Sequence, residues 1–390
     1  MMKRIGSRER EYVLEVLDSQ FHTSAASNMT KRLEETFAGK YGVKYAIAHI
    51  NGTATMHAAL AACDVGPGDE VIVPPLTMAS TSFAVLHANA APVFAEVDPN
   101  TFTIDPIDIQ KRITPRTRAI IPVALYGLSP DMDGIMEIAN RYNLTVIEDD
   151  AQCFLGYYKG RIVGSIGHMA SFSFQSSKHI TSGEGGMVIT NCQEFADRVR
   201  RFSGLGYAML KADPSKGIIT KDTIQDPKYE RHVSVGWNYR MSELCAAVAL
   251  AQVERLEELV LQRIKIAQMY AEAVNGCDWL VPQAVPDGYK HSYWTYVLKL
   301  ENGDEFSWHD FRKKYIELGG DGIYAAWQLT YLEPALRNLK FQAQEYKRGL
   351  CPVAESIQPK LVQLKTNYMD MSVARQKAEA LAETISYFQG

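Results

Sequence analysis

The segment 171–186 reads Ser-Phe-Ser-Phe-Gln-Ser-Ser-Lys-His-Ile-Thr-Ser-Gly-Glu-Gly-Gly, and it places Lys178 among hydroxyl groups and glycines after an apolar strand. A lysine amine in such surroundings can form a Schiff base with an aldehyde and then move a proton between neighbouring carbons. A single lysine is more often a solvated surface residue. The assignment of this chemistry to Lys178 therefore depends on two other segments.

The first of these segments, 146–152, ends an apolar strand with carboxylates. In an α/β fold the carboxyl ends of the strands open onto the site, so Asp149 could keep a pyridine nitrogen protonated and make the ring an electron sink. Gln152, one turn on, could stack beneath such a ring or bond to its 3-oxygen. Asp149 could equally be a helix N-cap, and this segment alone leaves the two interpretations even.

The second segment, Asn-Gly-Thr-Ala at 51–54, follows a short apolar strand and begins an alanine-rich helix. Such a helix start presents free backbone N–H groups to a phosphate, although a plain strand-to-helix turn looks the same. All three segments lie at strand ends of one predicted sheet. Their combination favours a pyridoxal-phosphate (PLP) site with Lys178 and Asp149 as catalytic residues and no metal.

The elements that must position these residues alternate along the chain. Short apolar runs separated by helical stretches occur at 45–50, 71–73, 93–96, 119–125, 146–148 and 167–190. This alternation is typical of a parallel sheet buried on both faces. We expect an α/β fold with a helical lead-in at 1–20, a large cofactor-binding domain at 21–260 and a small C-terminal α+β domain at 261–390.

Two long stretches stand out within this organisation. Residues 241–270 have one long helical pattern, expected to be the spine between the two domains. Residues 207–233 are polar and are expected to form a long surface insertion.

Composition and charge exclude several classes of protein. The 390 residues carry a net charge of −4, whereas a nucleic-acid partner would require a basic domain. Residues 1–9 lack the apolar core of a signal peptide, and no apolar run reaches the roughly 18 residues of a membrane span. The six cysteines stand singly, which predicts neither a metal site nor a disulfide framework. We therefore expect a cytoplasmic protein.

Over nearly its whole length the chain resembles the DegT-type sugar aminotransferases, which are PLP enzymes of fold type I, the aspartate aminotransferase fold. That fold has a mostly parallel seven-stranded-type sheet in the large domain. The motifs that carry the resemblance are Asn-Gly-Thr-Ala (51–54), Gly-Pro-Gly-Asp-Glu-Val-Ile-Val-Pro (66–74), Ile-Thr-Pro-Arg-Thr-Arg-Ala-Ile (113–120), Glu-Asp-Asp-Ala-Gln (148–152), Lys178 with Gly-Glu-Gly-Gly (183–186), Gly-Trp-Asn-Tyr-Arg-Met-Ser-Glu (236–243) and Cys-Pro-Val-Ala-Glu (351–355).

The resemblance implies a role for each matching residue. Lys178 forms the Schiff base, Asp149 pairs with the pyridine nitrogen, and Gln152 contacts the ring oxygen. The phosphate-binding residues are Gly52 and Thr53, with Ala54 in the same turn, and Ser173. Asn238 is expected to reach the phosphate of a neighbouring subunit, which implies a homodimer with shared active sites.

Three positions need separate comment. Met78 stands where the family usually has an aromatic residue on the cofactor ring, and a thioether can pack there. The strand before Tyr-Gly reads Val-Ala at 123–124 where relatives often have Val-His. In a dehydratase branch histidine replaces the lysine itself. Here the spacing to Gly-Glu-Gly-Gly selects Lys178, so His179 is expected to be structural.

Aromatic residues in the smaller domain are the candidates for substrate contact, namely His291, Trp327 and Tyr331. Aromatic clusters are more often core. The resemblance implies a ping-pong transfer from L-glutamate (or glutamine) to a keto-sugar, usually nucleotide-linked. Amination of a free cyclitol ketone, or dehydration of an amino-shikimate-type substrate, is the alternative. A PLP-binding regulator without turnover is the third hypothesis.

Overall fold

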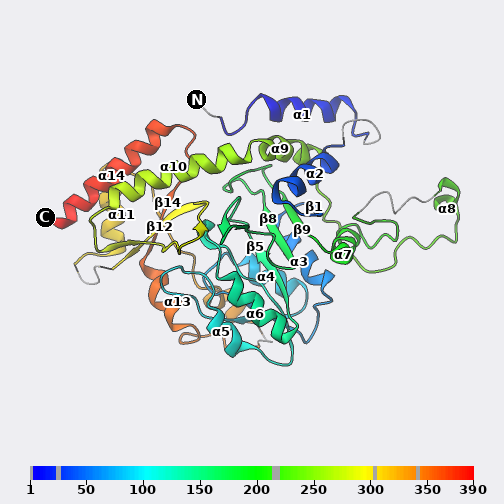
Figure 1. The fold of residues 1–390 in the computed structure, drawn as a ribbon, viewed down its shortest axis with the longest axis horizontal. Coiled ribbons are helices and arrows are strands. Elements are labelled where there is room, and N and C mark those ends of the chain that lie inside the picture. The colour runs from blue at the N-terminus through cyan, green and yellow to red at the C-terminus, as the bar shows by residue number, and fades with distance from the viewer. Residues whose placement is uncertain (1–2, 23–27, 213–219, 302–304, 340–342) are drawn as a thin grey trace.

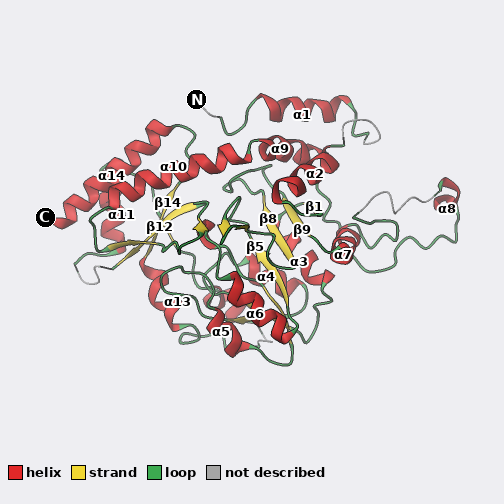
Figure 2. Ribbon diagram, in the orientation of Figure 1, coloured by secondary structure: helices red, strands yellow, loops and turns green. Residues whose placement is uncertain are grey.

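The computed structural model describes residues 3–22, 28–212, 220–301, 305–339 and 343–390. Their centre is a seven-stranded sheet with helices on both faces and a second, smaller sheet beside it (Figures 1 and 2). The strands of the large sheet, in chain order, are β1 (Tyr45–His49), β2 (Glu70–Val73), β3 (Ala91–Phe94), β4 (Thr117–Ile120), β5 (Thr145–Asp149), β8 (Met169–Ser173) and β9 (Gly186–Thr190).

The spatial order of these strands is β1-β9-β8-β5-β4-β2-β3. Strand β9 pairs antiparallel with β1 and β8, and the other pairs are parallel. The mostly parallel sheet expected from the sequence is thus confirmed. The strand expected at 119–125 is shorter than predicted, because β4 ends at Ile120 and residues 125–127 form a 3-10 turn.

Alternating side chains of the strands pack against helices on the two faces. Ile47 joins a core with α3 (Gly52–Ala62), whereas Ala46 and Ala48 join a different core on the other face. The first face also carries α4 (Ser80–His87) and α7 (Gln193–Ser203). The second face is covered by α2 (Met29–Tyr41), α5 (Pro106–Arg112), α6 (Met132–Tyr142) and α9 (Glu243–Glu254).

The smaller sheet is antiparallel in the order β10-β12-β14-β13, with bounds Leu280–Pro282, Thr295–Leu300, Leu361–Lys365 and Tyr324–Ala325. Its core is shared with α10 (Leu256–Val274), α11 (Trp308–Glu317) and α14 (Met371–Gln389). The remaining described elements include α1 (Ser7–Asp18), α8 (Lys221–Gln225), α12 (Pro334–Arg337), α13 (Pro352–Ile357) and a small sheet of β6 (Tyr157–Tyr158), β7 (Arg161–Ile162) and β11 (Tyr289–Lys290).

The prediction of a single helix at 241–270 was wrong, because the structure divides this segment into α9 and α10. Arg255, at φ −114° and ψ 25°, separates the two helices. Its guanidinium donates to the carbonyl oxygens of Lys3 and Arg4, so the break lies where the N-terminal segment docks. The described part of 207–233 carries α8 and projects from the sheet (Figure 1), while 213–219 lie outside the described residues.

Three further observations concern the described residues. No helix within the described ranges has the length and apolar character needed to cross a membrane. All six cysteines are free thiols. Across those same ranges, His, Cys, Asp and Glu side chains form no group of three or more that could hold a metal ion.

Candidate active site

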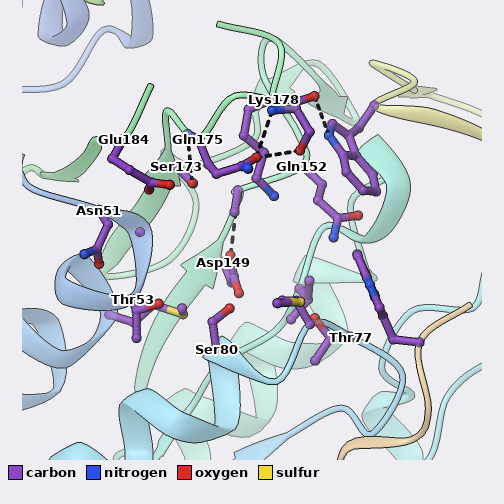
Figure 3. A pocket seen from close by; sticks show the side chains of 18 residues that line it. Asn51, Thr53, Thr77, Ser80, Asp149, Gln152, Ser173, Gln175, Lys178 and Glu184 are labelled. Atoms are coloured by element: carbon purple, nitrogen blue, oxygen red, sulfur yellow. Dashed lines mark hydrogen bonds between the residues drawn. The ribbon is translucent and has the colours of Figure 1, made fainter. Parts of the chain in front are cut away.

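A cavity of about 340 Å³ opens at the carboxyl ends of β5 and β8, next to the N-terminus of α3 (Figure 3). Most residues predicted to form the site line it together. The lining comprises Asn51, Gly52, Thr53, Met56, Thr77, Met78, Ser80, Val123, Asp149, Ala151, Gln152, Ser173, Gln175, Ser177, Lys178, Glu184, Trp294 and Trp327.

Lys178 enters the cavity from the loop between β8 and β9. Its Nζ lies 5.0 Å from the centroid of the Trp294 ring, a cation–π distance. Burial, the largest cause, and the charge of Arg263 together lower the pKa of the Lys178 amine to about 8, while the charges of Asp149 and Glu184 oppose the change. A much larger fraction of this amine is therefore neutral and nucleophilic near neutral pH than of an ordinary lysine.

Asp149 is the last residue of β5 and is 3% exposed. Thr81, in the first turn of α4, donates to its Oδ2 at 2.8 Å, and the backbone N–H of Ala151 donates to its Oδ1 at 3.2 Å. Burial raises the pKa of Asp149, while these two hydrogen bonds and the charge of Lys178 oppose the rise. Both carboxylate oxygens are therefore oriented by donors, which gives the carboxylate a fixed direction.

Gln152 is buried beside the cavity, and its Oε1 accepts from the backbone N–H of Tyr126 at 2.7 Å. With the oxygen engaged, the amide nitrogen is the group left to donate. Tyr126 has a φ of +63°, a conformation rare for a bulky residue. The bond to Gln152 ties this unusual turn to the cavity.

The start of α3 lies close against the end of β8. A Cβ on Gly52 would come within 2.8 Å of the Ser173 Cβ, so only glycine fits this approach. The Asn51 side chain caps the helix by accepting from the Ala54 N–H at 2.8 Å. First-turn amides have no partner within their own helix. Because the Ala54 amide is engaged, those of Gly52 and Thr53 are the ones that could hold an anion.

Two tryptophans from the C-terminal part of the chain form one side of the cavity. Trp294 and Trp327 stack with ring centroids 5.9 Å apart and an interplanar angle of 28°. The indole N–H of Trp294 donates to the carbonyl of Ser177 at 3.0 Å. A second cavity of about 410 Å³ adjoins the first, because Ser177, Trp294 and Trp327 line both. Met78 also lines the first cavity and is half exposed.

His291 and Tyr331, which were expected to contact the substrate, do not line the cavity. The His291 Nδ1 accepts from the Tyr293 N–H at 2.8 Å, and Nε2 bonds to Gln283 Oε1 at 2.9 Å, so both nitrogens have protein partners. Tyr331 is fully buried, and its hydroxyl donates to Glu355 at 2.5 Å. Both are built into the core, which is the commoner location for an aromatic side chain.

Asn238 also lies outside this cavity. It is exposed and forms an isolated antiparallel bridge with Gly204. His179 is fully buried, and its Nε2 bonds to the carbonyl of Ser292 at 2.9 Å. Burial and the charges of nearby arginines keep the pKa of His179 well below its ordinary value. His179 is thus a neutral residue that joins two segments of the chain, and this agrees with the structural role expected for the neighbour of Lys178.

Sequence reasoning missed several residues of the site. Thr77, Ser80 and Thr81 stand in the hydroxyl-rich segment Thr-Met-Ala-Ser-Thr-Ser (77–82) that follows the buried strand β2, and hydroxyl residues after a buried strand are the signal that could have found them. Trp294 stands three residues after His291 but was not among the predicted site residues. Its contact with Ser177 spans 117 positions, which no local pattern reveals.

The seven-stranded sheet with a lysine and a carboxylate at its carboxyl edge defines the chain as a fold type I aminotransferase. Residues 3–382 match the sequence model of the DegT/DnrJ/EryC1/StrS aminotransferase family, and the chain belongs to that family. The resemblance noted in the sequence is confirmed.

Among curated relatives, the chain is 40% identical over 302 residues to GDP-perosamine synthase of Caulobacter vibrioides, covering 77% of this chain and 76% of the relative. It is 35% identical over 340 residues to a UDP-N-acetyl-3-dehydro-alpha-D-glucosamine 3-aminotransferase of Acidithiobacillus ferrooxidans, covering 86% and 83%.

Among solved structures, an aminotransferase from Psychrobacter cryohalolentis superposes with a TM-score of 0.87 at 29% identity, covering 98% of this chain and 97% of that one. The putative sugar aminotransferase Spr1654 of Streptococcus pneumoniae, solved in its PLP-form, superposes with a TM-score of 0.84 at 22% identity over 98% and 97%. At 22% identity, the similarity to Spr1654 shows the fold alone.

Proposed function

We propose that this chain is a PLP-dependent aminotransferase that moves an amino group from L-glutamate (or glutamine) to a keto-sugar linked to a nucleotide. The observation that carries the proposal is the Lys178 amine in the cavity, with its pKa lowered to about 8 and with Asp149 among the groups that line the same cavity. A desolvated lysine of this kind is a nucleophile toward an aldehyde.

The residues present fit the cofactor group by group. The amides of Gly52 and Thr53 and the Ser173 hydroxyl suit a phosphate, and the glycine lets Ser173 lie close against the helix start. The Asp149 carboxylate, held by Thr81 and Ala151, suits a protonated pyridine nitrogen. The Gln152 amide suits the ring oxygen, and Met78 the ring face. When bound, pyridoxal phosphate supplies an aldehyde and a ring that stores an electron pair.

The roles of the chain's own groups follow from their chemistry. Among the described residues that line the first cavity, Lys178 is the only one with an amine, guanidinium or imidazole. Lys178 is therefore the residue that would bind the cofactor aldehyde covalently and that would hold and move the proton at the reacting carbon. The Asp149 carboxylate would hold the protonated pyridine nitrogen in place. The neighbouring tryptophans exclude water from one side.

The acceptor is proposed from the size of the site and from the relatives. The second cavity adjoins the first at Trp294 and Trp327, so there is room for a substrate larger than a free sugar. The printed names of two relatives contain GDP- and UDP-linked sugars. These observations favour a nucleotide-linked keto-sugar over a free cyclitol ketone or an amino-shikimate-type substrate.

A second copy of the chain is part of the proposal. Val235 is 90% exposed and Trp237 is 52% exposed, with Val233 nearby, and an exposed apolar segment of this kind is typical of an interface. Asn238 follows directly and is exposed. We propose that a partner subunit covers this segment and that Asn238 reaches the partner's cofactor phosphate.

The decisive experiment is Lys178→Ala, with Lys159→Ala as the matched control because Lys159 is a half-exposed surface residue paired with Asp133. The variant is expected to lose the visible absorbance of the lysine-bound cofactor and all turnover, while the control keeps both. Full turnover by folded Lys178→Ala would refute the assignment.

A substrate screen then separates the acceptor classes. Cofactor-loaded enzyme is first mixed with L-glutamate or L-glutamine, and formation of 2-oxoglutarate or its amide is measured. GDP- and UDP-linked keto-sugars and cyclitol ketones are then offered to the aminated enzyme. Turnover of a nucleotide-linked sugar alone supports the proposal. A cofactor that saturating donor fails to convert would instead indicate a regulator.

A further inference from the structure

The backbone around Lys178 is held by two arginines from distant parts of the chain. Arg4 donates through separate nitrogens to the carbonyl oxygens of Lys178 and His179, both at 2.6 Å. Arg263 donates from one nitrogen to the carbonyls of Ser177 at 3.0 Å and Lys178 at 2.7 Å. Three consecutive carbonyls thus accept from two guanidinium groups, and that of Lys178 accepts from both.

Arg263 is unusual because it is a buried cation with neutral partners. It is 2% exposed, and its other nitrogen donates to the Trp294 carbonyl at 2.7 Å and the Thr366 hydroxyl at 3.3 Å. Within the described ranges, Arg263 forms no ion pair with a carboxylate. Burying an unpaired charge is expensive, so a role confined to packing would be better filled by an apolar side chain.

Arg4 reaches the turn because the N-terminal segment is tied to the junction of α9 and α10. Arg255 donates to the carbonyls of Lys3 at 2.9 Å and Arg4 at 2.7 Å, and Gln252 donates to the Arg4 carbonyl at 2.8 Å. Glu9, which is 2% exposed, accepts from Arg255 at 2.6 Å. Figure 1 shows α1 lying along α9, and the two helices are in contact. These contacts hold the N-terminal segment at a place from which Arg4 reaches the carbonyls of Lys178 and His179.

We propose that Arg4 and Arg263 are positioning residues that clamp the turn 177–179 and so fix the point from which Lys178 enters the cavity. The inference rests on the proposed function, since it assigns the clamp to the residue that binds the cofactor. A turn without such a clamp would let the amine move relative to Asp149, and a misplacement of about 1 Å can cost roughly a hundredfold in rate.

The clamp also has an electrostatic consequence. Arg263 and burial lower the pKa of the Lys178 amine, while Asp149 and Glu184 raise it. The other side chain that faces the amine is Trp294, whose ring is neutral. Removing the charge of Arg263 leaves burial as the remaining cause that opposes the two carboxylates, so the protonated form of the lysine nitrogen should persist to higher pH.

The test uses cofactor-loaded enzyme carrying Arg263→Gln, Arg4→Gln or Arg4→Lys, with Arg141→Gln as control because Arg141 forms an exposed ion pair with Glu137 within α6. Arg263→Gln should raise the pH midpoint of the lysine-bound cofactor's absorbance by about 1 unit. Arg4→Gln should slow the glutamate half-reaction about tenfold while the cofactor stays bound. Arg4→Lys should recover part of the rate, because an ammonium can replace one of the two donors.

The outcomes separate the clamp from the function on which it rests. A midpoint and half-reaction rate equal to wild type in both glutamine variants would overturn the clamp. So would a slow Arg4→Gln that Arg4→Lys does not improve, because that is the signature of a merely structural contact. If Arg263→Gln does not fold, the half-reaction rates of Arg4→Gln and Arg4→Lys test the clamp by themselves. A wild-type enzyme that shows no such absorbance would instead refute the proposed function itself.

Discussion

The two sides of the cavity are built differently. One side, here called the floor, consists of Gly52, Asp149, Gln152 and Ser173 at strand ends and helix starts of the large sheet. The other side, here called the wall, is the stacked pair Trp294 and Trp327 from the C-terminal part of the chain. The floor is polar, and hydrogen bonds orient its groups; the wall is aromatic and presents faces.

This difference suggests a division of work. Oriented charges such as the Asp149 carboxylate act on whatever reacts above them, so the floor should serve every substrate alike. Flat apolar surfaces discriminate by shape, so the wall should matter for one substrate and little for another. Lys178 belongs to both, because it faces Asp149 electrostatically and lies over the Trp294 ring.

The largest effect is expected from the floor. Asp149→Asn keeps the size of the side chain and can still accept from Thr81, but it loses the charge. Turnover should fall about a thousandfold in both half-reactions, as when a preorganised charge is removed. Stopped-flow rates with donor and acceptor measure this. Asp133→Asn, an exposed control, should behave as wild type; an Asp149→Asn effect confined to one substrate would contradict the division.

The wall should respond selectively. Trp327→Ala removes the stacking partner of Trp294 and opens the first cavity to the second. We expect KM for the sugar acceptor to rise about 30-fold, equivalent to roughly 2 kcal/mol for a buried aromatic contact, with the glutamate half-reaction changed less than about threefold. Trp327→Phe should give a KM for the sugar acceptor between those of the wild type and Trp327→Ala. Equal loss with both substrates would show that the wall serves the chemistry instead.

A pH series sharpens the position of Lys178 between the two sides. Its pKa is lowered to about 8, so the neutral amine dominates above that pH. The rate at which the cofactor-free enzyme captures pyridoxal phosphate should therefore rise about tenfold from pH 7 to 9 and then level off. A lysine of ordinary pKa would give about a hundredfold rise without a plateau. Trp327→Ala, which leaves the charges in place, should keep the wild-type profile.

The floor was largely predictable from the sequence, whereas the wall was predicted only in part, since Trp327 was among the expected site residues and Trp294 was not. Gly52, Asp149 and Lys178 follow strands whose apolar runs are readable locally, and parallel strand ends meet at one edge of a sheet. Ala54 was expected to bind phosphate with its neighbours, but its amide serves the Asn51 cap, a choice between two acceptors that spacing does not decide.

The contacts that sequence reasoning missed join positions far apart along the chain. Arg4 reaches the Lys178 carbonyl across 174 positions, and Thr81 reaches Asp149 across 68. Such pairings depend on how elements pack after they form. The same reason explains the aromatic residues of the C-terminal part: Trp327 lines the cavity, whereas His291 and Tyr331 have the same character in sequence but are buried in the core.

The smallest effect tests where the wall ends. Tyr331→Phe removes the hydroxyl that donates to Glu355 at 2.5 Å and leaves the fully buried ring beside Phe94. The expected cost is about 1 kcal/mol of folding free energy, because the partly buried Glu355 carboxylate loses one of its donors, with kcat and KM within about twofold of wild type. Denaturant unfolding and steady-state kinetics measure the two. A tenfold rise in acceptor KM would extend the wall to Tyr331 and restore its predicted contact with the substrate, whereas loss of stability alone confines selectivity to the tryptophan pair.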